Sequence, residues 1–141
     1  SRLDVDAAMG FLKSNGFEES AISFVGASIG ANLALDALSR YDNCRAAVLL
    51  SPGIDYRGVK TETALKNISA GQRILAVAAE GDEYSAESVV ALAAKNSSIV
   101  KKIFAGAERI TAFTKLLHLP LPNLNSLNHV YSTKNKQTGF Y

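Results

Sequence analysis

The chain has 141 residues, a formal net charge of +2 and a single cysteine, and its length is that of one domain. So small a net charge argues against nucleic acid or an anionic membrane as a partner. No apolar stretch is long enough to span a bilayer, and one cysteine excludes an intrachain disulfide and a cysteine-based metal cluster. We therefore expect a cytoplasmic protein without such partners.

Hydrophobic periodicity predicts helices and strands that alternate along residues 4–105. Asp4 is the expected N-cap of the first helix, with Met9 and Phe11 in the core, and Ser85 is the expected N-cap of the last helix. The alternation is typical of an α/β fold with a mainly parallel sheet of about four strands, flanked by helices on both faces. In chain order we expect a helix at 4–14, a strand at 21–25, a helix at 29–38, a strand at 45–50, a loop at 54–59, a helix at 62–68, a strand at 72–79, a helix at 86–95 and a strand at 98–105.

The most informative stretch is Gly26-Ala27-Ser28-Ile29-Gly30, which fits the pattern G-x-S-x-G between an expected strand and an expected buried helix. In this context the pattern indicates a nucleophile elbow, with the serine at the tip of a sharp and strained turn. Gly26 and Gly30 would let strand and helix pass close together. The backbone N–H of Ile29, at the positive end of the helix, would donate to an oxyanion. The alternative is a glycine- and serine-containing turn without chemistry.

With this elbow and the order of elements around it, residues 4–107 resemble the C-terminal half of the α/β-hydrolase family, especially its esterase and dienelactone-hydrolase-like members. The resemblance implies that Ser28 attacks the carbonyl of a small ester or similar acyl substrate. It also implies a histidine that acts as base, an acid that orients the histidine, and no metal or organic cofactor. Hydrolysis and acyl transfer to another acceptor would use the same residues.

The acid of this family usually follows the third strand of this half, and Asp82 stands at that place in the sequence. Such a position lies just past the carboxyl end of a strand, where the sites of α/β proteins form. Glu80 and Glu83 are the alternatives, and a turn or capping role is the alternative for Asp82. Three further residues could line the site from loops, although packing or surface roles are favoured for them: Asp55, Tyr56 and Tyr84.

The histidine that the resemblance implies is not at its expected place. The family often has Gly-Ala-x-His-Gly after the last strand, whereas residues 106–110 of this chain read Gly-Ala-Glu-Arg-Ile. Arg109 therefore stands where the base should be, and arginine stays protonated and cannot accept the proton of Ser28. His118 and His129 are the only histidines of the chain, and neither has the surroundings that the family predicts.

The composition changes at the same point. All 13 acidic residues lie at or before Glu108, so we expect a hydrolase-like domain at 1–107 and an atypical, poorly ordered or loosely packed tail at 108–141. We hypothesise that this tail is translated out of frame. One codon choice for residues 108–112, GAA-CGC-ATC-ACG-GCx, would encode Thr-His-His-Gly when the same bases are read two positions later.

The resemblance also bears on the other end of the chain. The family's first strands, and the loop that supplies the second oxyanion donor, precede the helix at 4–14. We therefore expect half of the oxyanion hole to be missing, which costs on the order of a hundredfold in rate. The strand at 21–25 would be central in the family, so here we expect an open apolar edge and self-association through it.

Two functions remain in view from the sequence. The first is a serine hydrolase with Ser28 as nucleophile, Asp82 as acid and the Ile29 N–H as oxyanion donor. The second is a truncated or degenerate relative without activity, which Arg109 and the missing first half favour. The sequence gives little support to a third function, nucleotide binding, because neither of its motifs, G-x-G-x-x-G and G-K-[ST], is present.

Overall fold

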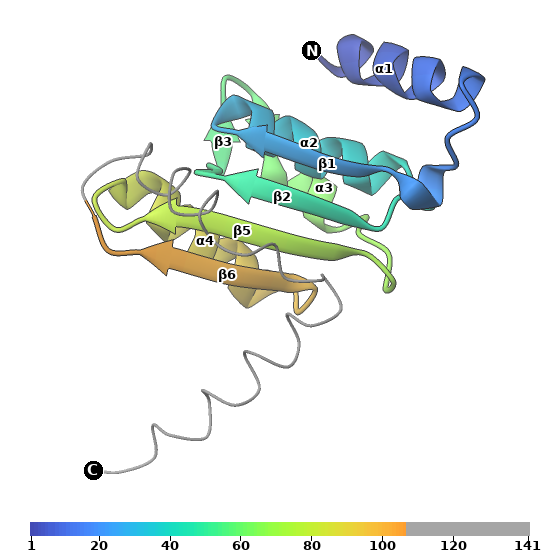
Figure 1. Cartoon of the computed structure of the whole chain (residues 1–141). Coiled ribbons are helices and arrows are strands. Elements are labelled where there is room, and N and C mark those ends of the chain that lie inside the picture. The colour runs from blue at the N-terminus through green and yellow to red at the C-terminus, as the bar shows by residue number, and fades with distance from the viewer. Residues whose placement is uncertain (107–141) are drawn as a thin grey trace.

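The computed structural model describes residues 1–106, and its centre is a four-stranded, all-parallel sheet in the order β1-β2-β5-β6 (Figure 1). The prediction of an α/β fold is thereby confirmed. The strands of the sheet are β1 (Ser23–Ala27), β2 (Ala46–Leu50), β5 (Arg73–Ala79) and β6 (Ile99–Phe104). The other elements are α1 (Arg2–Ser14), the short 3₁₀ helix η1 (Glu19–Ala21), α2 (Ile29–Arg40), β3 (Asp55–Tyr56), β4 (Val59–Lys60), α3 (Thr61–Leu65) and α4 (Glu83–Lys95).

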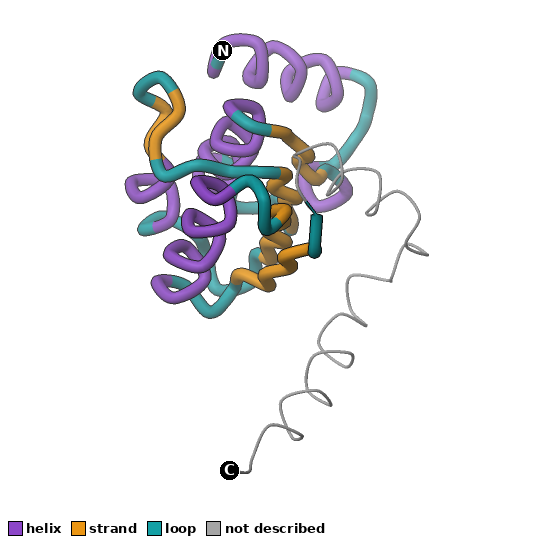
Figure 2. Tube along the Cα trace, turned by 90° about the vertical axis from the view of Figure 1, so that its left-hand side faces the viewer, coloured by secondary structure: helices purple, strands orange, loops and turns teal. Residues whose placement is uncertain are grey.

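Helices α2, α3 and α4 all lie on one face of the sheet, and α1 lies beyond the β1 edge (Figures 1 and 2). The expectation of helices on both faces is not met by residues 1–106. The predicted tail at 108–141, with Arg109 and both histidines, lies outside the described residues.

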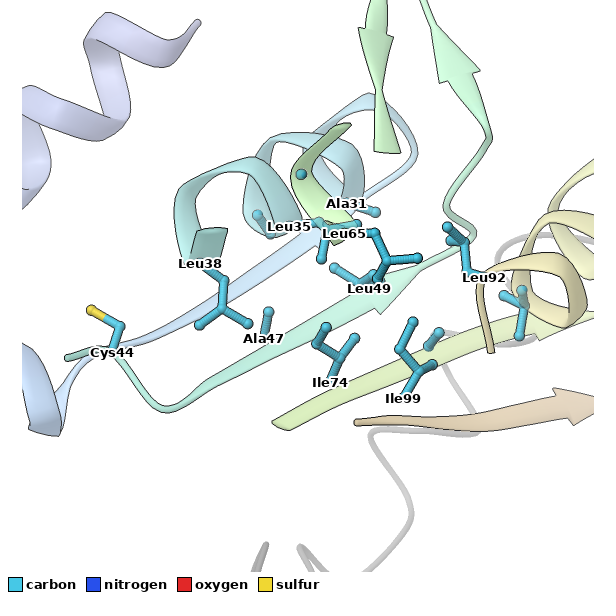
Figure 3. Close-up of a cluster of buried hydrophobic side chains, with 14 of the residues drawn as sticks. Ala31, Leu35, Leu38, Cys44, Ala47, Leu49, Leu65, Ile74, Leu92 and Ile99 are labelled. Atoms are coloured by element: carbon cyan, nitrogen blue, oxygen red, sulfur yellow. The ribbon is translucent and has the colours of Figure 1, made fainter. Parts of the chain in front are cut away.

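The main core fills the space between the sheet and its three helices (Figure 3). Helix α2 is its centre, because Leu35 and Leu38 are fully buried against Ala47 and Leu49 of β2. Asn32 and Asp36, two polar residues of this helix, are buried too, and each is hydrogen-bonded. The helix is thus buried nearly all round, as its apolar sequence predicts.

The opposite face of the sheet is also apolar. The strand register sets Val25, Val48, Leu75 and Val100 in one row across the four strands. Val25 is 69% exposed, and it belongs to β1, the terminal strand of the described sheet. The other terminal strand, β6, carries Lys101 and Lys102, which are residues that protect sheet edges from pairing with other chains. The β1 edge has no such charge, so self-association through it stays a prediction.

Several local expectations were wrong, for physical reasons. Asp4 is not the N-cap of α1, because the helix begins two residues earlier, at Arg2, with Ser1 as cap and Asp4 in the first turn. Met9 is buried as expected, but Phe11 is 67% exposed, because α1 turns only one side to the protein. Ser85 lies inside α4, whose N-cap is Asp82.

The expected loop at 54–59 is the hairpin β3–β4. Asp55 pairs with Lys60 and Tyr56 with Val59, so the turn has two residues. Arg57 and Gly58, the turn residues, both have positive φ, 51° and 82°, as a type I′ turn requires. The glycine was the available signal, but the arginine before it is not a residue that predicts this turn.

Helix α1 is joined to α2 by polar contacts as well as by Met9. The Arg40 guanidinium and the Tyr41 hydroxyl both donate to Oδ1 of Asp6, at 2.6 and 2.8 Å. These two hydrogen bonds hold the pKa of Asp6 below its ordinary value, and the one from Arg40 has the larger effect. Folding lowers this pKa, so the carboxylate stabilises the folded state above its unfolded pKa. That contribution is lost as the pH falls through the lowered pKa.

We expect Asp6→Asn to lower the melting temperature at pH 7, and the difference from the wild type to shrink as the pH falls from about 6 to about 3. Thermal unfolding followed by circular dichroism measures both. Glu87→Gln, which removes an exposed carboxylate that forms no ion pair within residues 1–106, is the matched control. An Asp6→Asn difference that is the same at every pH would contradict the assignment.

Candidate active site

Ser28 stands alone between the end of β1 at Ala27 and the start of α2 at Ile29. Its backbone has φ 54° and ψ −124°, a region that side-chain-bearing residues rarely adopt and that is held only by the surrounding structure. The surroundings hold it from both sides. The Ser28 N–H donates to the Leu50 carbonyl at 2.8 Å, and the Ser28 carbonyl accepts from the Ala31 N–H at 2.9 Å. The predicted sharp, strained turn is present.

Gly26 makes this turn possible. A Cβ placed on it would lie 2.0 Å from the Gly30 carbonyl oxygen and 2.8 Å from the Ala31 nitrogen. No side chain fits there, because the first turn of α2 passes directly over β1. Gly30 differs from the expectation, since a Cβ on it would meet nothing within 4 Å. The close approach of β1 and α2 therefore requires glycine at position 26, where the Gly30 backbone leaves no room for a Cβ. It does not require glycine at position 30.

The N–H of Ile29 is the first of helix α2. The first N–H groups of a helix have no acceptor inside it and carry its positive partial charge. The group lies beside the Ser28 side chain in sequence and at the same end of the helix. This position is the one that the predicted role as an oxyanion donor requires, and the role itself stays a prediction.

Asp82 follows β5 and is the N-cap of α4. In a parallel sheet the carboxyl ends of all strands meet at one edge, which is the edge at the arrowheads in Figure 1. Ser28 and Asp82 therefore share this edge, with β2 between their strands. Two strand spacings are about 10 Å, which leaves room for one side chain that would bridge the two. Glu80 and Glu83, the alternatives, are both exposed.

Residues 1–106 contain no histidine to serve as that bridge. Arg109, His118 and His129 lie outside the described residues, so their relation to Ser28 stays a prediction.

The segment between β2 and α3 is fixed against the start of α2 by Asn32. The Asn32 amide donates to the carbonyls of Gly53 (2.9 Å) and Val59 (2.7 Å), and its oxygen accepts from the Gly53 N–H (3.1 Å). Asn32 is 1% exposed, and it lies one helical turn after Ser28. It therefore ties the hairpin to the same helix turn that carries the elbow.

Tyr56 and Tyr84 pack the hairpin against α4. Their rings meet edge to face with centroids 5.6 Å apart, and a Cβ on Gly53 would lie within 2.7 Å of both. The Tyr84 hydroxyl donates to the Asp55 carbonyl at 2.9 Å and accepts from the Asp55 N–H at 3.0 Å. These contacts agree with the packing role that the sequence favours for the three residues.

Ser51 is a residue of this edge that sequence reasoning missed. It follows β2, has φ 48°, is only 4% exposed, and donates its N–H to the Val77 carbonyl at 2.7 Å. The sequence hides it, because a residue before proline is expected in extended backbone and Ser51 precedes Pro52. Like Ser28, it has a positive φ directly after a strand of the sheet.

A hollow of about 780 Å³ lies at the other edge of the sheet, where the strands begin. Its lining includes Glu19, Asn43 and Cys44, which precede β1 and β2. It is therefore separate from the edge that carries Ser28. Cys44 is buried there, and this burial is the main reason why the pKa of its thiol is raised. A raised pKa disfavours the reactive thiolate, in line with a structural role.

Comparison with family models, curated proteins and solved structures gave no match to this chain. Within residues 1–106, no helix has both the length and the apolar character needed to cross a bilayer. No group of three or more histidine, cysteine or acidic residues in the same part of the chain could hold a metal ion.

We expect Gly26→Ala to destabilise the protein by about 3 kcal/mol or more, because the added methyl group would overlap the backbone of α2. Gly30→Ala, in the same motif, should leave the free energy of unfolding unchanged or raise it by up to about 1 kcal/mol. Urea unfolding of the two variants beside the wild type measures the difference. Equal effects of the two substitutions would contradict the packing described for the elbow.

Proposed function

We propose that this chain carries the nucleophile and the acid of a serine hydrolase that acts on carboxylic esters or related acyl compounds. Ser28 is the nucleophile, the Ile29 N–H the oxyanion donor, and Asp82 the acid. The observation that carries the proposal is the backbone of Ser28, at φ 54° between a parallel strand and a buried helix. A plain strand-to-helix turn gains nothing from such strain, whereas a nucleophile elbow requires it.

The reaction would proceed through an acyl-enzyme. The Ser28 oxygen bonds to the carbonyl carbon, the proton of its hydroxyl passes to a base, and the alcohol leaves with a proton from that base. Negative charge develops on the carbonyl oxygen, where the Ile29 N–H and the positive end of α2 stabilise it. Water then attacks the acyl group and releases Ser28. The base would have to lie between Ser28 and Asp82.

A second function is favoured by one specific observation. Residues 1–106 contain no histidine, and Ser28 is a weak nucleophile without a base. The alternative is therefore a non-catalytic relative of such hydrolases, in which the elbow persists as structure. The strain at Ser28 would then have no remaining use, which is why we place this function second.

The two functions differ in the first turnover with p-nitrophenyl acetate. For the hydrolase we expect a rapid burst of p-nitrophenol, at most one equivalent per chain, that Ser28→Ala abolishes. Asp82→Asn should slow the burst at least tenfold, because the base would lose its orientation. Stopped-flow absorbance measures the burst. The burst reports acylation of Ser28 alone, so it is seen even when deacylation is slow.

Asp42→Asn, which neutralises an exposed carboxyl at the opposite edge of the sheet, is the matched control for Asp82→Asn. Circular dichroism and thermal unfolding establish that each variant is folded. A folded wild type without a burst would overturn the hydrolase proposal and support the non-catalytic relative.

A further inference from the structure

We propose that Ser51 is a second polar residue of the Ser28 site, whose hydroxyl donates a hydrogen bond to the group bound at Ser28. The inference rests on the proposed function and extends it, because it assigns a substrate contact to a residue outside the nucleophile, acid and oxyanion donor.

The strand register places Ser51 beside Ser28. Ala27 pairs with Leu50 in the parallel ladder, so the next residues, Ser28 and Ser51, stand side by side at the carboxyl edge. Neighbouring strands are about 4.8 Å apart. Strand β2 also lies between β1 and β5, so Ser51 stands between the strand of Ser28 and the strand that leads to Asp82.

The hydroxyl of Ser51 is available to a ligand. Within residues 1–106 it has no hydrogen-bond partner, although the residue is only 4% exposed. No fully buried side-chain oxygen or nitrogen in that part of the chain lacks a partner. The Ser51 oxygen must therefore reach the surface at least in part. A surface-reaching hydroxyl that bonds to no group of residues 1–106 can donate to a bound ligand.

The residue type is itself informative. At φ 48° glycine would be free of strain, whereas serine is not. Asn32 fixes the neighbouring Gly53 by both its N–H and its carbonyl, so the backbone here is held by contacts that do not involve the Ser51 side chain. The Cβ of Ser51 thus adds strain, and its hydroxyl forms no hydrogen bond within residues 1–106. Binding at the adjacent Ser28 is the role that accounts for both.

Two substitutions separate the hydroxyl from the backbone strain. Ser51→Ala removes the hydroxyl and keeps the strained Cβ, whereas Ser51→Gly removes both and relieves the strain. The rate of covalent labelling of Ser28 by a fluorophosphonate reads out the site, as the serine oxygen bonds to phosphorus and fluoride leaves. We expect both variants to be labelled about five- to tenfold more slowly than the wild type, the effect of one lost hydrogen bond.

Stability gives the readout that distinguishes a structural role. We expect Ser51→Gly to melt at or above the wild-type temperature and still to be labelled slowly. Ser39→Ala, which removes a hydroxyl bonded to the Asp36 carbonyl near the far end of α2, should be labelled at the wild-type rate.

The outcomes keep the two proposals apart. If the wild type is labelled at Ser28 and Ser51→Gly is labelled equally fast, the role of Ser51 is overturned and the proposed function stands. Labelling rates that follow the melting temperatures of the two variants would also overturn it. If the folded wild type takes no label at Ser28, the proposed function fails and this inference fails with it.

Discussion

The passage of the α2 backbone over Gly26 is the constraint on which the rest of the structure depends. The Gly30 carbonyl occupies the volume where a side chain at Gly26 would begin. This contact sets α2 onto the sheet at the end of β1, and it forces the chain through Ser28 in one strained turn. Helix α2 then forms the centre of the main core, so the geometry of the candidate site and the stability of the domain arise from the same packing.

The parallel register extends this constraint to a row of residues. Each strand ends at the same edge, and the N–H groups of Ser28, Ser51 and Glu80 donate to carbonyls in the last three residues of a neighbouring strand, at Leu50, Val77 and Phe104. The turns that follow are thus held by the sheet itself. Loops that are fixed by a rigid sheet are where α/β proteins place their chemistry.

The sequence predicted the elements with strong periodicity or a specific motif, and it failed where tertiary contacts decide. The elbow was predictable because two glycines and a serine at fixed spacing between a strand and a helix have few structural uses. The strain at Ser51 could not be predicted, because Pro52 argues for extended backbone there. The exposure of Phe11 could not be predicted either, because periodicity cannot tell which side of α1 faces the protein. A histidine that could act as the base of Ser28 is absent from residues 1–106, so the structure does not test this part of the prediction.

The central claim is that strain at Ser28 serves a nucleophile, and the site of covalent modification tests it most directly. The folded protein is treated with a fluorophosphonate at neutral pH, digested, and analysed by tandem mass spectrometry. The account predicts the phosphonyl group on Ser28 and on no other serine, although Ser51 lies one strand away. A folded protein that carries the group on another residue, or carries none, would contradict the account.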